Sequence, residues 1–236
     1  MAYWKTAVQS EVAIRRREQV MLNLTQLIKE LLQSGWQNGE KETAADEAVL
    51  KAIDYRNHDL NRERSVIDWL QRYKVLMGFS AETRASIASQ IITFADGRQQ
   101  KSLDLDKNKI VSEFNKLGDL INEKVPPNAT GGARDVTSLT SKALWCCYPN
   151  DVPIFDRNAV SALGVISRIC HLAPERNQSK YADFVDVWLQ VYGQVDSVIE
   201  QADLSDCPYK VRALDRLLWY LGDAGFYCRA DSSAAQ

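Results

Sequence analysis

The sequence has few of the residues that ligate metals, cross-link a chain or interrupt secondary structure. Its 236 residues include 2 histidines and 5 cysteines, and the cysteines lack the CxxC spacing of a zinc site or a redox pair. We therefore expect no metal and no cofactor. Glycine and proline number only 11 and 6 while 45% of the residues are hydrophobic, which excludes a low-complexity or disordered chain.

Long apolar runs and an excess of one charge are also missing. No run of about 18 apolar residues predicts a membrane span, and the first residues lack the order of a secretory signal. We expect a soluble, cytoplasmic protein. The net charge is −2, so nothing global attracts a polyanion. Basic residues outnumber acidic ones between 97 and 142, and any contact with nucleic acid is expected there.

Helical periodicity is present almost throughout, and no stretch alternates with a period of two residues. The sequence thus predicts an all-α fold for 1–236. Expected N-caps are Ser80, Asp156, and Thr137 or Ser138. The segment VPPNATGGARD is the strongest break and predicts two helical lobes, 1–125 and 126–236. The expected helices cover about 8–33, 44–55, 66–77, 81–94, 109–122, 138–148, 157–172, 181–201 and 209–222.

The stretch TSLTSKALWCCYPNDVPIFDRNAV holds the residues best suited to chemistry. Lys142 is expected in the first turn of one helix and Asp156 at the cap of the next, with a proline-restrained turn between them. The two side chains could then meet at one end of a helical hairpin. A lysine becomes a nucleophile when its amine loses its proton, which a helix N-terminus and apolar neighbours both favour.

This part of the sequence contains, in order, a glycine-containing loop, a helix carrying lysine, a turn, a short segment ending PIFD and a new helix. This order resembles the helix-hairpin-helix DNA glycosylase superfamily. The phrases SKALW, PIFD and RALDRLLWYLG further resemble bacterial proteins of that kind, some of which look like phage-defence proteins. The resemblance implies a helix-hairpin-helix glycosylase-like fold, with two lobes around a cleft, that acts on double-stranded DNA without a cofactor.

The resemblance also implies roles for individual residues. Lys142 would match the Schiff-base lysine and Asp156 the catalytic aspartate. The imine that Lys142 would form with the sugar could then also cleave the DNA strand, which is AP-lyase activity. The excised base would be damaged or modified, in the defence case a hypermodified cytosine such as glucosylated hydroxymethylcytosine. Implied DNA contacts are Gly131, Gly132, Arg134, Ser141 and Arg157, and an implied base pocket comprises Trp145, Tyr148, Phe155 and Trp219.

Other interpretations of the same residues stay open. A lysine near a helix start is often a solvated residue or an ion-pair partner, an aspartate before a helix is often only a cap, and buried aromatics are often ordinary core. The chain would then be a non-catalytic α-helical module that binds DNA or a protein. A helical defence effector unrelated to DNA is the third interpretation.

Overall fold

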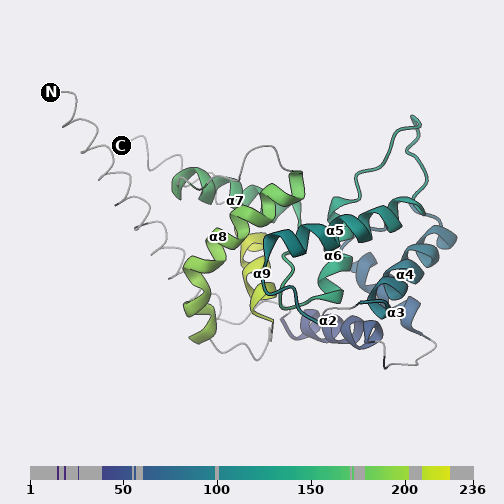
Figure 1. Ribbon diagram of the computed structural model, residues 1–236, viewed down its shortest axis with the longest axis horizontal. Coiled ribbons are helices and arrows are strands. Elements are labelled where there is room, and N and C mark those ends of the chain that lie inside the picture. Colours follow the sequence, from purple (N-terminus) through teal and green to yellow (C-terminus); the bar gives the residue numbers. More distant parts are fainter. Residues whose placement is uncertain are drawn as a thin grey trace. The chain divides into compact units, whose positions relative to one another are not determined.

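The computed structural model describes residues 39–54, 56, 61–98, 101–170, 172, 179–201 and 209–223, together with the isolated positions 15, 19 and 26. Within these residues the structure is all-α, with eight helices and no strand, which confirms the predicted class (Figure 1). Of the helix expected over 8–33, only positions 15, 19 and 26 are among the described residues, so this prediction lies outside what the structure describes. The helices are α2 Gly39–Ile53, α3 Arg62–Arg72, α4 Ala81–Asp96, α5 Lys107–Asn122, α6 Thr137–Cys147, α7 Arg157–Cys170, α8 Lys180–Gln201 and α9 Lys210–Asp223.

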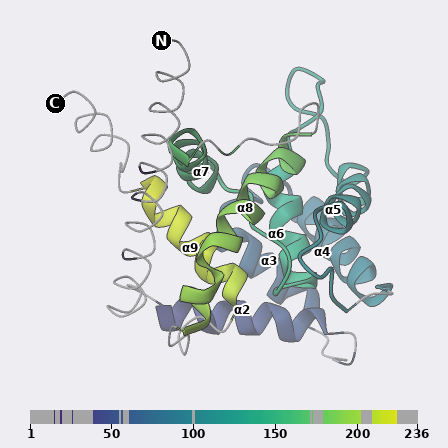
Figure 2. The ribbon, with the colours of Figure 1, turned by 60° about the vertical axis from the view of Figure 1, so that its left-hand side comes forward.

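The described helices belong to two compact units. Helices α2 to α6 lie in the unit Gln37–Phe155, and helices α7 to α9 lie in the other unit, between Asp156 and Asp223. Helix α6 packs against α2, α3 and α5. Figure 2 shows α6 beside α3 and α5. The expected lobe boundary after residue 125 therefore falls inside the first unit.

The first unit is held together by apolar stripes at helical spacing. Helix α3 buries Val66, Trp69 and Leu70, and α4 buries Ile87 and Ile91 on the side that faces its neighbours. Ser80 caps α4 as predicted, because its hydroxyl accepts a hydrogen bond from the Thr83 N–H at 3.2 Å.

Several helix boundaries differ from the predicted ones for local reasons. Helix α3 ends at Arg72, five residues early, because Lys74 adopts a φ of 57° and Gly78 a φ of 79°, which a right-handed helix does not allow. Helix α5 begins two residues early because the Asp106 carboxylate accepts from the Asn108 and Lys109 N–H groups.

The predicted cap of α6 is wrong. The helix begins at Thr137, and its N-cap is Val136, whose side chain offers no acceptor. The Asp135 carboxylate instead accepts from the Thr137 N–H at 2.9 Å. A cap by Thr137 or Ser138 would need those residues outside the helix, whereas both lie in its first turn.

The second unit is built on close contact between α7 and α9. A Cβ added at Gly222 of α9 would meet the backbone carbonyl of Asn158 in α7 and would lie 2.6 Å from its carbon. The predicted apolar stripe of α9 is confirmed as buried, and it comprises Val211, Leu214, Leu217, Leu218 and Leu221. No helix in the described part of the chain is long and apolar enough to cross a membrane.

Candidate functional site

Lys142 lies in the second turn of α6, not in the first turn as predicted. The helix begins five residues earlier, at Thr137, so the amine is farther from the helix N-terminus than the sequence suggested. The side chain is 1% exposed. Its Nζ donates a hydrogen bond to Ser138 Oγ at 2.9 Å, one turn back along the same helix, and lies 5.8 Å from the centre of the Tyr73 ring. Lys142 is therefore an interior residue and not a solvated one.

A buried acid and two aromatic rings accompany this lysine. Asp46 of α2 is 2% exposed, and its Oδ1 accepts from Trp69 Nε1 at 2.8 Å and from the Tyr73 hydroxyl at 3.4 Å. The Trp69 ring stacks on Trp145 at 5.5 Å with an interplanar angle of 8°, and it meets the Tyr73 ring at 4.7 Å. We call the set of residues formed by Asp46, Trp69, Tyr73, Ser138, Lys142 and Trp145 the lysine cluster.

The members of the lysine cluster from α2 and α3 were not predicted as site residues. Asp46 lies in a polar helix with five other charged residues, and nothing local marks it as the buried one. The spacing of Trp69 and Tyr73 by four residues is the one available signal, because it places two large rings on the same side of a helix.

Ser141 fastens the connection after α6 to the helix. Its hydroxyl donates to the Ser138 carbonyl at 3.1 Å and accepts from the Phe155 N–H at 3.0 Å, and the residue is fully buried. The hydroxyl that was predicted to contact DNA is thus used inside the protein. Ser141 is next to Lys142 in the sequence, and Phe155 is next to Asp156. This hydrogen bond therefore joins the two segments that carry Lys142 and Asp156.

Asp156 is confirmed as the N-cap of α7. Its Oδ1 accepts from the Asn158 N–H at 3.0 Å, and its carbonyl accepts from the Val160 N–H at 2.8 Å. The residue is half-buried. Lys142 belongs to the unit that ends at Phe155, and Asp156 opens the other unit, so the predicted convergence of the two side chains stays a prediction.

The loop that carries Gly131 and Gly132 folds around Asn128. The Gly132 N–H donates to Asn128 Oδ1 at 2.8 Å, and the Gly131 N–H donates to the Asn128 carbonyl at 2.9 Å. Gly131 has a φ of 80°, a conformation that favours glycine. Both amides that were predicted to bind a DNA phosphate already donate within the loop, so a phosphate would have to replace one of these bonds.

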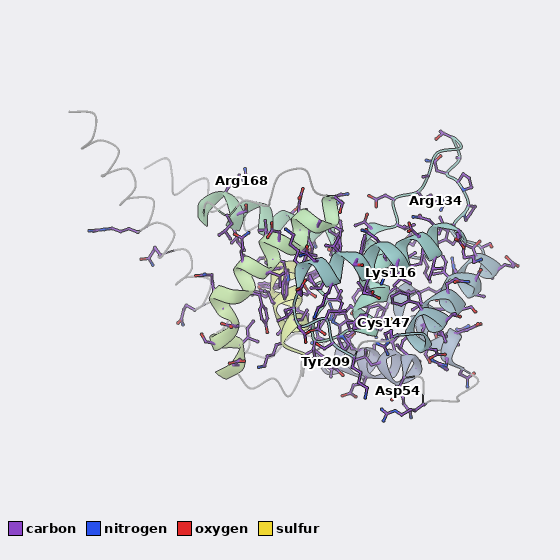
Figure 3. All side chains as sticks on the ribbon, viewed as in Figure 1. Asp54, Lys116, Arg134, Cys147, Arg168 and Tyr209 are labelled. Atoms are coloured by element: carbon purple, nitrogen blue, oxygen red, sulfur yellow. The ribbon has the colours of Figure 1, made fainter. Side chains whose placement is uncertain are left out.

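The two predicted arginines occupy different surroundings. Arg134 is half-buried where the loop returns to the helices, with its guanidinium 4.9 Å from the centre of the Phe79 ring (Figure 3). Arg157 is exposed as the first residue of α7. Arg157 is therefore the more accessible of the two cations.

The residues predicted for a base pocket divide between core and surface. Trp145, Tyr148 and Phe155 are all buried in the first unit, whereas Trp219 is 48% exposed on α9 of the second. Arg98 lies over the Tyr148 ring, and burial is the main cause that raises the pKa of the Tyr148 hydroxyl. The three buried rings therefore lie in the core of the first unit.

The adjacent Cys146 and Cys147 are buried, and no disulfide joins them. Burial raises the pKa of the Cys147 thiol to about 12, and Arg98 donates a hydrogen bond to the Cys147 carbonyl. Figure 3 labels Cys147 at the end of α6. The raised pKa of Cys147 argues against a nucleophilic thiol at this position, and no group of three metal-ligating side chains occurs among the described residues.

No family model matches the chain, and no curated protein or solved structure matches it.

Proposed function

We propose that the protein is a DNA glycosylase that excises a modified base, with Lys142 and Asp156 at its active site. The observation that carries the proposal is the buried amine of Lys142, held by Ser138 on the helix that leads directly to the Asp156 connection. A lysine among apolar residues and aromatic rings is the kind of amine that proteins use as a nucleophile. Its burial argues against the interpretation of Lys142 as a solvated surface residue.

The reaction assigned to these groups begins with the target nucleotide rotated out of the duplex, at a cost of a few kcal/mol in lost stacking. The neutral Lys142 amine attacks C1′ of the sugar while the N-glycosidic bond breaks and its electron pair leaves with the base. The Asp156 carboxylate stabilises the positive charge that develops on the sugar. As the sugar ring opens, the nitrogen gives up two protons, one to the ring oxygen, which becomes a hydroxyl, and one to the departed base, and an imine remains.

The imine can then react in two ways. Water can hydrolyse it, which returns the amine and leaves an abasic site. Alternatively, loss of a C2′ proton expels the 3′ phosphate by β-elimination and cleaves the strand. As the substrate we propose a glucosylated hydroxymethylcytosine, on the resemblance of SKALW and PIFD to phage-defence relatives.

The decisive experiment incubates the protein with duplexes that carry cytosine, hydroxymethylcytosine or its glucosylated form, and with phage DNAs of different modification. Released base, abasic sites and a borohydride-trapped protein–DNA adduct are measured. The Lys142→Met variant is expected to lose the adduct, whereas Lys116→Ala, which removes an exposed lysine of α5, is expected to keep it.

The test of Asp156 must separate its charge from its role as a cap. Asparagine caps helices about as well as aspartate, so Asp156→Asn keeps α7 and removes only the negative charge. We expect its base release to fall by at least about a hundredfold. Asp106→Asn makes the same change at the α5 cap and should leave activity unchanged. Salt-sensitive DNA binding without base release from any duplex would instead support the non-catalytic module.

A further inference from the structure

Tyr73 contacts both the amine and the carboxyl group of the lysine cluster. It follows α3 directly as the C-cap, with φ −87° and ψ 8°, so its side chain is positioned by the helix end. Its ring centre lies 5.8 Å from Lys142 Nζ, and its hydroxyl lies 3.4 Å from Asp46 Oδ1. One side chain therefore links a buried amine on α6 to a buried carboxylate on α2.

The contacts of Asp46 and Trp69 keep Tyr73 in place. Trp69 Nε1 donates to Asp46 at 2.8 Å and fixes the carboxylate, while the Trp69 ring packs on Tyr73 and on Trp145. Trp145 is three residues from Lys142 on the same helix, so the chain of contacts from Asp46 through Trp69 ends on α6 beside Lys142. Three helices thus hold the Tyr73 ring against the amine.

The exposures of these residues show where the amine lies. Tyr73 and Ser138 are half-buried and both contact Lys142, which is itself 1% exposed. The amine is thus in contact with two side chains that are themselves partly exposed. An aromatic face that has lost its water attracts an ammonium group and restricts where the flexible lysine stem can place it.

We propose that Tyr73 is a positioning residue for Lys142, holding the amine through its ring while its hydroxyl is anchored on Asp46. The inference rests on the proposed function, because it assigns to Tyr73 the alignment of the amine with C1′ of the sugar. A nucleophile that is displaced by about 1 Å can lose about a hundredfold in rate, so a side chain that fixes the amine matters to the reaction.

Two substitutions separate the ring from the hydroxyl. Tyr73→Phe keeps the ring over Lys142 and loses the contact with Asp46, whereas Tyr73→Leu loses both. We measure the single-turnover rate of borohydride trapping on saturating glucosylated duplex over a range of pH, so that a change in alignment is separated from a change in protonation. Tyr73→Leu should slow trapping about tenfold without changing the DNA dissociation constant, and Tyr73→Phe should stay within about threefold of the original protein.

A second measurement needs no DNA. Formaldehyde with cyanoborohydride alkylates lysines by way of a reduced imine, and peptide mass spectrometry gives the extent at Lys142 relative to the exposed Lys116. Tyr73→Leu should raise this ratio at least about fivefold because the ring no longer covers the amine, whereas Tyr73→Phe should not. Phe79→Leu removes a buried ring of the same unit that packs on Arg134, and it serves as the control for general loosening.

The outcomes distinguish the two proposals. If the original protein neither releases base nor forms a DNA adduct but the labelling ratios behave as expected, the glycosylase function is contradicted and the positioning of Lys142 by Tyr73 is supported. If the adduct forms and Tyr73→Leu changes neither the trapping rate nor the labelling ratio, the positioning role is overturned and the glycosylase stands. An equal rise in labelling for Phe79→Leu also overturns the positioning role.

Discussion

Asp151 shows how a single buried residue organises a polar segment. Its carboxylate accepts from the Leu103 N–H at 3.0 Å, the Leu105 N–H at 3.3 Å and the Ser102 hydroxyl at 3.2 Å. Asp104 and Leu105 have φ values of 56° and 52°, which cost conformational energy in residues other than glycine. The three hydrogen bonds offset this cost and tie the segment before α5 to the connection after α6.

Removal of this carboxylate should destabilise the protein. Asp151→Ala leaves two backbone N–H groups without their acceptor, so the free energy of unfolding should fall by about 2–4 kcal/mol. Urea denaturation measures the change. Asp119→Ala on the exposed side of α5 should cost less than about 0.5 kcal/mol, and equal midpoints for the two variants would contradict the role of Asp151.

Cys147 predicts a pH dependence whose sign can be worked out. Burial raises the pKa of its thiol from 9.0 to about 12 in the folded protein, so the unfolded chain loses this proton first. Between about pH 9 and pH 12 the folded state therefore binds more protons, and stability falls as the pH rises. The slope from this group approaches ~1.4 kcal/mol per pH unit.

Cys147→Ala should remove most of that slope between about pH 9 and pH 10. Urea unfolding at half-unit steps of pH measures it, with the stability at pH 7 as the reference for each protein. Burial also raises the pKa of Tyr148 and Tyr181, so a residual slope above about pH 10 is expected in both. An unchanged slope below pH 10 would show that the thiol ionises as easily in the folded state.

At the scale of helices, the sequence predicts existence better than boundaries. The Ser80 and Asp156 caps are local signals and were placed correctly, since each needs only a side chain next to a helical run. The end of α3 depends on the backbone of Lys74, and a lysine gives no sign of a positive φ. The start of α6 was placed one residue late because Asp135 and not Thr137 or Ser138 supplies the acceptor.

The lysine cluster could not be predicted from the sequence, for a different reason. Lys142 was identified from its motif, but Asp46 and Tyr73 come from α2 and from the end of α3, far from it in the chain. Helical periodicity tells which side of a helix is buried, and it does not tell which helix covers it. Partners across helices therefore required the tertiary structure.

Packing of α7 on α9 gives a prediction for the helices themselves. Gly222→Ala would drive a methyl group into the backbone of Asn158, which cannot move away as a side-chain end can, so we expect a loss of about 2–3 kcal/mol. Gly164→Ala is the matched control on α7, because a Cβ there meets nothing within 4 Å and alanine favours the helix by about 0.5–1 kcal/mol.

Thermal unfolding followed by circular dichroism compares the two substitutions. Gly222→Ala should lower Tm and Gly164→Ala should raise it, although the chemical change is the same. Equal effects of the same sign would mean that the α7–α9 approach is looser than the backbone geometry indicates.

For the whole molecule, charge decides how DNA could be approached. The net charge of −2 gives no general attraction to a polyanion, so affinity must come from a few individual cations. Lys109, Lys116 and Lys210 are paired with carboxylates. Arg157 is exposed at the start of α7, where it is accessible to a phosphate.

The salt dependence of DNA binding tests this distribution of charge. If Arg134 and Arg157 each contact one phosphate, affinity should fall about tenfold between 50 and 200 mM salt, because each contact releases about one counterion. Arg157→Ala should reduce that fall to about threefold in fluorescence anisotropy titrations. Arg64→Ala removes an exposed arginine that is paired with Asp68 and should leave the salt dependence unchanged. If affinity for DNA still falls tenfold in Arg157→Ala, the phosphate contacts lie elsewhere on the protein. If affinity does not depend on salt at all, double-stranded DNA is not a partner.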